Sequence, residues 1–198
     1  MLLNAFLVIV FTLAFLFLIW RKLKEDYIQG QIFGAGFSFL IGASVSLIAT
    51  IFILQEHWYI ICILTSFIFL FAYVFKFKMN YFEVIEAFVP SFIVFNIFIL
   101  VMKYLILRDL KLAALFFVNV LCLIAYYISK KYYKSFRWYP SGRIGFSGLS
   151  TISLFFILYS IVAVLPFHMI SFLSKIGVFV SFAISILSTV LIIRISRK

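Results

Sequence analysis

Two carboxylates three residues apart, Glu83 and Glu86, are the most suggestive pair of reactive side chains in the sequence. On a helix, residues at this spacing share one face, so both carboxylates would lie together at the start of the same element. One interpretation is a cation or proton site, or a polar anchor near a lipid head group. The other is structural, because the helix dipole favours acidic residues at an N-terminus. The sequence leaves both interpretations open.

A second set of reactive side chains combines two histidines with an arginine, namely His57, Arg108 and His168. A histidine next to Glu56, with a second histidine and an arginine nearby in space, could perform acid–base chemistry on a lipid head group. The alternative is ordinary loop charge, because Arg108 and Asp109 fall in a hairpin between two apolar segments. Catalysis by this set requires the three loops to converge.

Asn96 and Asn119 are polar residues inside apolar segments, where we expect interhelical hydrogen bonds or, with the two glutamates, an intramembrane polar site. Cys62 and Cys122 each lie alone in an apolar segment, which predicts packing and not metal binding. The sequence contains no H-E-x-x-H, no G-x-S-x-G and no carboxylate-rich metal cluster. It therefore predicts no metal site and no cofactor.

The elements that must position these residues are long apolar segments. Hydrophobic residues make up 67% of the 198 positions, and the mean hydropathy is +1.26. This exceeds the range of soluble domains, and a helix needs about 20 apolar residues to cross the hydrocarbon core. The sequence predicts an all-α polytopic membrane protein that forms a single domain over residues 1–198. We expect seven spans, at about 2–20, 31–54, 58–75, 82–102, 112–129, 145–167 and 171–193.

Basic residues are distributed unequally between the two sets of connections. Thirteen of the 17 Lys and Arg residues follow the first, third, fifth and seventh segments. The other four are Lys103, Arg108, Lys111 and Lys175. Since positively charged loops remain in the cytoplasm, we expect the N-terminus outside and the C-terminus inside.

The net charge of +11 raises the alternative of a nucleic-acid partner. The basic residues, however, flank apolar segments and interleave with Tyr and Trp, as in residues 130–138. This pattern is typical of an anionic lipid surface and an aromatic interfacial belt. We therefore expect membrane lipids, including anionic phospholipid, as partners and no nucleic acid.

Small residues and a proline predict two local features. Gly34, Ser38 and Gly42 share one helix face, which favours close packing against another helix. Pro90 lacks the amide hydrogen that would bind the backbone carbonyl of Glu86, so it should leave that carbonyl unpaired and bend the fourth segment.

Three stretches resemble the prolipoprotein diacylglyceryl transferase family. They are RKLKEDYIQGQIFGAGFSFLIGA (21–43), FKFKMNYFEVIEAFVPSF (75–92) and GRIGFSGLSTISLFFILYSI (142–161), and the resemblance covers about residues 7–165. It implies a seven-helix fold in the bacterial inner membrane. It also implies transfer of a diacylglyceryl group from phosphatidylglycerol to a lipobox cysteine.

The chain departs from this family where the family places its working side chains. No His-Gly-Gly element opens the third segment near residues 63–67, and the family's Gly-Ala-Arg reads Gly42-Ala43-Ser44 here. In place of an arginine and a Gly-Asn signature, residues 95–101 have only Asn96 as a polar residue. The family's Tyr-Gly-x-x-Arg becomes Tyr159-Ser160-Ile161-Val162-Ala163. We therefore expect a divergent, lipid-handling relative that has lost the transferase reaction.

Two other function classes are consistent with the sequence. One is a small membrane transporter or its substrate-binding subunit, with a polar cavity lined by Asn96, Asn119 or Tyr126. The other is a non-catalytic membrane assembly subunit, whose protein partner the sequence does not name. If the chain is an enzyme, the resemblance implies a phosphatidylglycerol-dependent transferase.

Overall fold

Seven α-helices form the part of the chain that the structure describes, and no strand occurs among those residues. The computed structural model describes residues 2–52, 58–108, 110–133, 144–164 and 175–196. The helices are α1 (Leu2–Leu23), α2 (Gln29–Phe52), α3 (Trp58–Lys76), α4 (Tyr81–Leu107), α5 (Leu110–Tyr132), α6 (Phe146–Val164) and α7 (Lys175–Ser196). The predicted all-α class is confirmed.

Five of these helices are long and apolar enough to cross a membrane, judged on the described residues alone. The segments are Tyr59–Lys76, Tyr81–Val101, Leu112–Tyr132, Phe146–Val164 and Gly177–Ser196, in α3 to α7. Each has about the length that the hydrocarbon core of a bilayer requires. The chain therefore has the helices of a membrane protein.

Helix α4 is the longest and extends furthest beyond its expected bounds of 82–102. It ends at Leu107, and Pro90 lies inside it without ending it. Arg108 follows in the left-handed conformation (φ 51°, ψ 36°), and its N–H donates to the carbonyl of Tyr104 (2.8 Å). A left-handed residue at this place is a common helix stop. The chain accordingly turns at once into α5.

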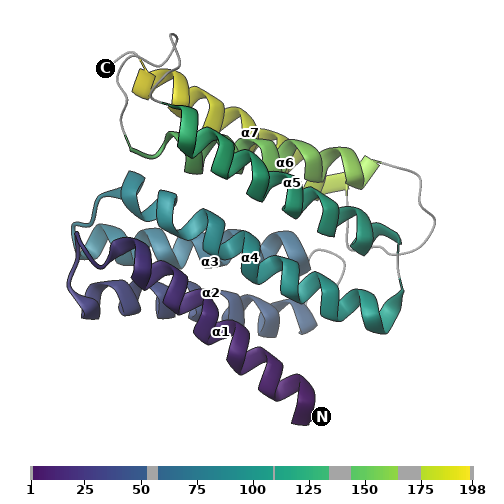
Figure 1. Cartoon of the computed structure of the whole chain (residues 1–198). Coiled ribbons are helices and arrows are strands. Elements are labelled where there is room, and N and C mark those ends of the chain that lie inside the picture. Colours follow the sequence, from purple (N-terminus) through teal and green to yellow (C-terminus); the bar gives the residue numbers. More distant parts are fainter. Residues whose placement is uncertain (1, 53–57, 109, 134–143, 165–174, 197–198) are drawn as a thin grey trace.

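Figure 1 shows the helices packed side by side, with consecutive helices running in opposite directions. The C-terminus and the α1–α2 and α3–α4 connections lie at one end of the bundle, and the N-terminus and the α4–α5 connection lie at the other (Figure 1). Helix α4 packs against α1, α3, α5 and α6. It therefore contacts helices of both the N-terminal and the C-terminal half of the chain.

The first core cluster joins α1, α2, α3 and α4 and is rich in phenylalanine. The ring centroid of Phe15 lies 5.4 Å from that of Phe39 and 6.0 Å from that of Phe88. All three side chains are at most 2% exposed. Because lipid tails are as apolar as these rings, close packing of the helices supplies much of their mutual attraction.

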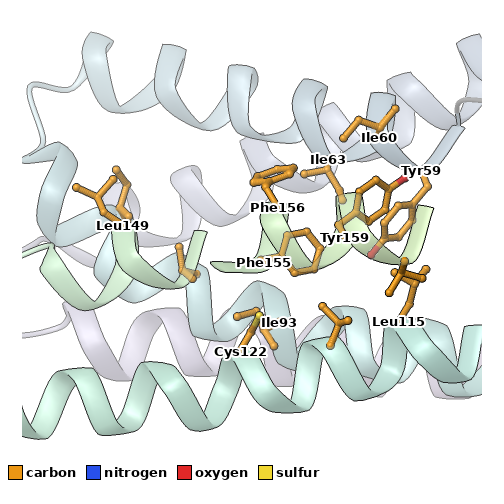
Figure 2. Packing of buried hydrophobic residues seen from close by; sticks show 14 of the residues in the cluster. Tyr59, Ile60, Ile63, Ile93, Leu115, Cys122, Leu149, Phe155, Phe156 and Tyr159 are labelled. Carbon is orange, nitrogen blue, oxygen red and sulfur yellow. The ribbon is translucent and has the colours of Figure 1, made fainter. Parts of the chain in front are cut away.

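The second core cluster joins α3, α4, α5, α6 and α7. Figure 2 shows Tyr59 of α3 beside Tyr159 of α6, and the two rings stack with centroids 5.7 Å apart. Phe155 and Phe156 lie near them on α6, next to Ile63 (Figure 2). Aromatic residues of α6 thus fill the space between α3 and the C-terminal helices.

Helices α2 and α3 approach closely because glycines of α2 face α3. A Cβ added at Gly42 would lie 2.9 Å from the Cα of Ser66, and one at Gly34 would lie 1.9 Å from the hydroxyl of Tyr73. Small residues permit such approach between helices in a membrane. The packing role predicted for these two glycines is confirmed.

Candidate functional site

Most charged residues of the described chain gather at one end of the bundle, which we call the basic end. It consists of residues 21–31, 74–83, 126–133, 144–148 and 192–196, together with Glu86 (Figure 1). All four acidic residues with described side chains also lie here and line one cleft; they are Glu25, Asp26, Glu83 and Glu86. Both signs of charge are therefore concentrated in one place.

Glu83 holds the N-cap residue of its own helix, α4, in place. The side chain of the N-cap residue Asn80 accepts the N–H of Phe82 (3.1 Å), and its Nδ2 donates to Glu83 Oε1 (2.8 Å). The hydroxyl of Tyr27 donates to Glu83 Oε2 (2.5 Å) and accepts the backbone N–H of Asn80 (2.9 Å). In a capping box the Glu83 carboxylate would bind the backbone N–H of Asn80 directly, whereas here the Tyr27 hydroxyl lies between them. Tyr27 thereby fastens the α1–α2 connection to α4.

The hydroxyl of Tyr27 is stabilised in its neutral form. Burial and the hydrogen bond to Glu83 raise the pKa of Tyr27 from 10 to about 12. Both effects act in the same direction, because a phenolate here would be desolvated and would face a carboxylate. Tyr27 therefore remains a donor throughout the physiological pH range.

Glu86 caps a different helix, α6. Its Oε2 accepts the backbone N–H of Gly148 (2.8 Å), and its Oε1 accepts the hydroxyl of Ser147 (2.5 Å). Amide groups in the first turn of a helix lack partners within the helix and attract negative charge. The two helices come this close because Gly148 has no side chain: a Cβ there would lie 3.2 Å from the Cα of Glu86. Glu86 thus joins α4 to α6.

The backbone carbonyl of Glu86 takes its donors from two other helices. Tyr126 of α5 donates its hydroxyl to this carbonyl (3.0 Å). Lys22 of α1 donates to the Tyr126 hydroxyl and lies 3.5 Å from the same carbonyl. The Lys22 ammonium also lies 4.4 Å from the centroid of the Tyr126 ring, within the range of a cation–π contact. One residue of α4 therefore holds α1, α5 and α6 together.

A cleft of about 500 Å³ opens at the basic end between α1, α4 and α5. We call it the α1–α5 cleft. Its described lining comprises Leu18, Arg21, Lys22, Leu23, Glu25, Asp26, Glu83, Glu86, Ala87, Tyr127, Lys130 and Ile144. A neighbouring cleft of about 420 Å³ shares Glu86, Lys130 and Ile144 with it. The α1–α5 cleft is therefore amphipathic, with apolar and charged side chains in one concavity.

Asn96 and Asn119 meet elsewhere, in the interior of the bundle. Asn96 Nδ2 donates to Asn119 Oδ1 (2.9 Å) and to the hydroxyl of Tyr59 (2.6 Å), and Asn119 Nδ2 donates to the carbonyl of Leu115 (2.8 Å). Asn96 follows Glu86 by ten positions, which is roughly 15 Å along a helix. The glutamates and asparagines accordingly form two separate clusters.

Of His57, Arg108 and His168, only Arg108 lies among the described residues. It is exposed and ends α4, at the end of the bundle opposite the basic end (Figure 1). His57 and His168 lie outside the described residues. The convergence of these three residues stays a prediction.

The sequence does not single out three residues that contribute at the basic end: Lys22, Tyr27 and Ser147. It groups Tyr126 with the asparagines, yet in the structure Tyr126 contacts Lys22 and Glu86. A partial signal existed for Ser147, because Ser-Gly opens the sixth apolar segment and such residues are common at helix starts.

Comparison with known proteins does not assign this arrangement to a family. No protein-family model, curated protein or solved structure matches the chain. The site at the basic end must therefore be interpreted from its own geometry.

Proposed function

We propose that the chain is an integral protein of the cell membrane, of bacterial inner-membrane type, that handles membrane lipids without catalysis. In this proposal all seven helices cross the membrane, with the N-terminus outside and the basic end in the cytoplasm. The placement of α1 and α2 beside the five apolar helices supports seven spans, and the gathering of Lys and Arg at one end supports the orientation.

The observation that carries lipid handling is the amphipathic lining of the α1–α5 cleft. Leu18 and Ile144 offer apolar surface, whereas Arg21, Lys22 and Lys130 offer positive charge within the same concavity. A phospholipid presents the same two chemistries, an apolar glyceride and a phosphate. Pockets that combine apolar walls with a few placed polar groups are typical of ligand sites.

The lack of catalysis is proposed from the residues at positions that resemble the diacylglyceryl transferases. Where that family has its two arginines, this chain has Ser44 and Ala163, and neither side chain can carry a positive charge. The Ser44 hydroxyl donates to the backbone carbonyl of Leu40 in its own helix (3.0 Å).

The topology can be tested with reporter fusions. We expect a fluorescent protein fused to the C-terminus to fluoresce, because it folds in the cytoplasm. Alkaline phosphatase fused after Arg108 should be active, because it is exported. The opposite pair of results would overturn the proposed orientation.

Lipid handling can be tested by purifying the protein in detergent and extracting bound lipid for mass spectrometry. We expect phospholipid to remain at a fixed ratio to protein after exhaustive washing. Release of all lipid, as from an unrelated helical membrane protein treated identically, would contradict the proposal.

The absence of catalysis can be tested by complementation. Expression in a strain lacking diacylglyceryl transferase should fail to restore growth, and rescue would refute the non-catalytic assignment.

A further inference from the structure

Three cations line the α1–α5 cleft without an ionic partner. Arg21, Lys22 and Lys130 all face this concavity, and no carboxylate of the described chain lies within ion-pair distance of them. Lys22 is close enough to Lys130 for their like charges to oppose each other, and the attraction of Lys22 to the Glu86 carboxylate is weaker than this repulsion. A bound anion would relieve this repulsion.

The four carboxylates of the same cleft fall into two pairs, one with hydrogen-bonded side chains and one without. Glu83 and Glu86 accept hydrogen bonds from neutral donors: Glu83 binds the side chain of the N-cap residue of α4, and Glu86 caps the N-terminus of α6. Glu25 and Asp26 lie exposed on the α1–α2 connection, with no hydrogen bond to their side chains in the described structure. Among the described residues, the cleft therefore presents three cations that form no ion pair and two carboxylates that accept no hydrogen bond.

Lys22 is held in place before any ligand arrives. Its ammonium donates to the hydroxyl of Tyr126 and lies over the same ring. A lysine that is already oriented loses less side-chain entropy when it binds. Lys22 is thus a fixed point, whereas Lys130 is exposed on α5 and can adjust.

We propose that the α1–α5 cleft binds a phosphate ester that carries a primary ammonium group, with Lys22, Lys130 and Arg21 on the phosphate and Glu25 and Asp26 on the ammonium. The mixture of unpaired charges fits a zwitterionic head group better than a purely anionic one, which would face the two carboxylates. This inference rests on the proposed lipid-handling function and names its ligand class.

The source of this chemistry is either an aminophospholipid or a soluble phosphate ester of an amino alcohol. Leu18 and Ile144 supply accessible apolar surface beside the charged part of the lining, which matches the glyceride portion of a lipid.

The test uses the full-length protein in detergent and native mass spectrometry, which resolves each bound lipid. Short-chain phosphatidylethanolamine is compared with phosphatidylcholine, which has equal charge but no ammonium hydrogens, and with phosphatidylglycerol, which lacks an ammonium. We expect phosphatidylethanolamine to bind at least about fivefold more tightly than either, since ammonium–carboxylate hydrogen bonds are charge-assisted. Equal affinity for all three lipids would overturn the proposal.

Substitutions test separately the cations that bind the phosphate and the carboxylates that bind the ammonium. Lys130→Gln should lower the affinity for phosphatidylethanolamine by roughly fivefold or more, because a cation near a lipid surface contributes about 1 kcal/mol to binding. The double variant Glu25→Gln/Asp26→Asn should bind phosphatidylethanolamine only as tightly as phosphatidylcholine. Its affinity for phosphatidylglycerol should not fall. Lys24→Gln is the matched control, because Lys24 is exposed at the same end but lies near Trp20, outside the lining. An equal loss in Lys24→Gln, or an equal loss of all lipids in the carboxylate variant, would refute the site.

The remaining arm adds soluble phosphoethanolamine and measures thermal unfolding. Stabilisation by the soluble ester at concentrations as low as the lipid requires would assign the site to a soluble ligand. In that case the site stands and lipid handling falls. If phospholipid still copurifies with the Lys130→Gln and carboxylate variants in wild-type amounts and composition, lipid handling stands and this site falls.

Discussion

The hydroxyl of Tyr126 donates to the backbone carbonyl of Glu86 at 3.0 Å, where a regular helix would use the amide of residue 90. Residue 90 is a proline and has no such amide, so the donor comes from α5. Lys22 of α1 donates a hydrogen bond to the same hydroxyl. A sequence feature that weakens α4 thus becomes the point to which α1 and α5 attach.

Substitution of Tyr126 tests this compensation. Tyr126→Phe should lower the free energy of unfolding by about 1–3 kcal/mol, because it leaves buried polar groups unpaired. In a Pro90→Ala background the helix regains its own donor, so the same substitution should cost less. Denaturation of the four proteins in detergent gives the coupling between the two positions, and a coupling of zero would contradict the relationship.

Glu86 should stabilise α6 through its carboxylate. Glu86→Ala removes the acceptor for both Gly148 and Ser147 and should cost about 1–3 kcal/mol. Ser147→Ala removes one of these hydrogen bonds and should cost less. Hydrogen exchange of the first amides of α6 should accelerate in Glu86→Ala. Unchanged exchange there would show that the cap does not hold the helix end.

Close packing of α2 on α3 predicts a contrast between two glycines. Gly42→Ala places a methyl group 2.9 Å from the backbone of Ser66 and should destabilise the protein by about 1–3 kcal/mol. Gly30→Ala is the matched control, because no atom lies within 4 Å of the added methyl group. It should be neutral or slightly stabilising, as alanine favours helix. Equal thermal unfolding temperatures for the two variants would contradict the observed helix contact.

The buried asparagine pair should show strong non-additivity. Asn96→Leu or Asn119→Leu alone leaves a polar partner unsatisfied and should cost about 1–2 kcal/mol. The double variant removes both polar groups and should cost less than the sum of the two. Additive losses in a double-mutant cycle would show that the two amides do not depend on each other.

The Tyr27–Glu83 hydrogen bond predicts a pH dependence at alkaline pH. Because the pKa of Tyr27 is raised from 10 to about 12, its contribution to stability is fully present below pH 10 and is lost as the pH rises through 12. The difference in stability between wild type and Tyr27→Phe should therefore be constant from pH 7 to 10 and should shrink above pH 10. A constant difference up to pH 12 would contradict this linkage.

The helices were predictable because a run of about 20 apolar residues has few alternatives to a membrane-crossing helix. Pro90 likewise predicted that the carbonyl of Glu86 lacks its helical donor, since proline has no backbone N–H in any context. The partner of that carbonyl was not predictable. Lys22 and Tyr126 are 104 positions apart, and many tyrosines and lysines flank the apolar segments.

The role of Glu86 shows a second limit of local patterns. A carboxylate near the start of a helix is expected to act on its own helix, as Glu83 does with Asn80. Glu86 instead reaches α6, and this depends on the absence of a side chain at Gly148, 62 positions away. Such pairing follows from the three-dimensional packing of α4 on α6.

The contact between Phe15 and Phe88 has a consequence for biogenesis. The ring of Phe15 on α1 packs against that of Phe88 on α4, which is translated 73 residues later. Until α4 is synthesised, α1 can pack only against α2, through contacts such as Phe15 with Phe39, and the surface that will receive Phe88 is solvated by lipid or held by the insertion machinery. Release of a nascent chain that stops before α4 should leave this part of α1 uncovered and accessible to membrane proteases.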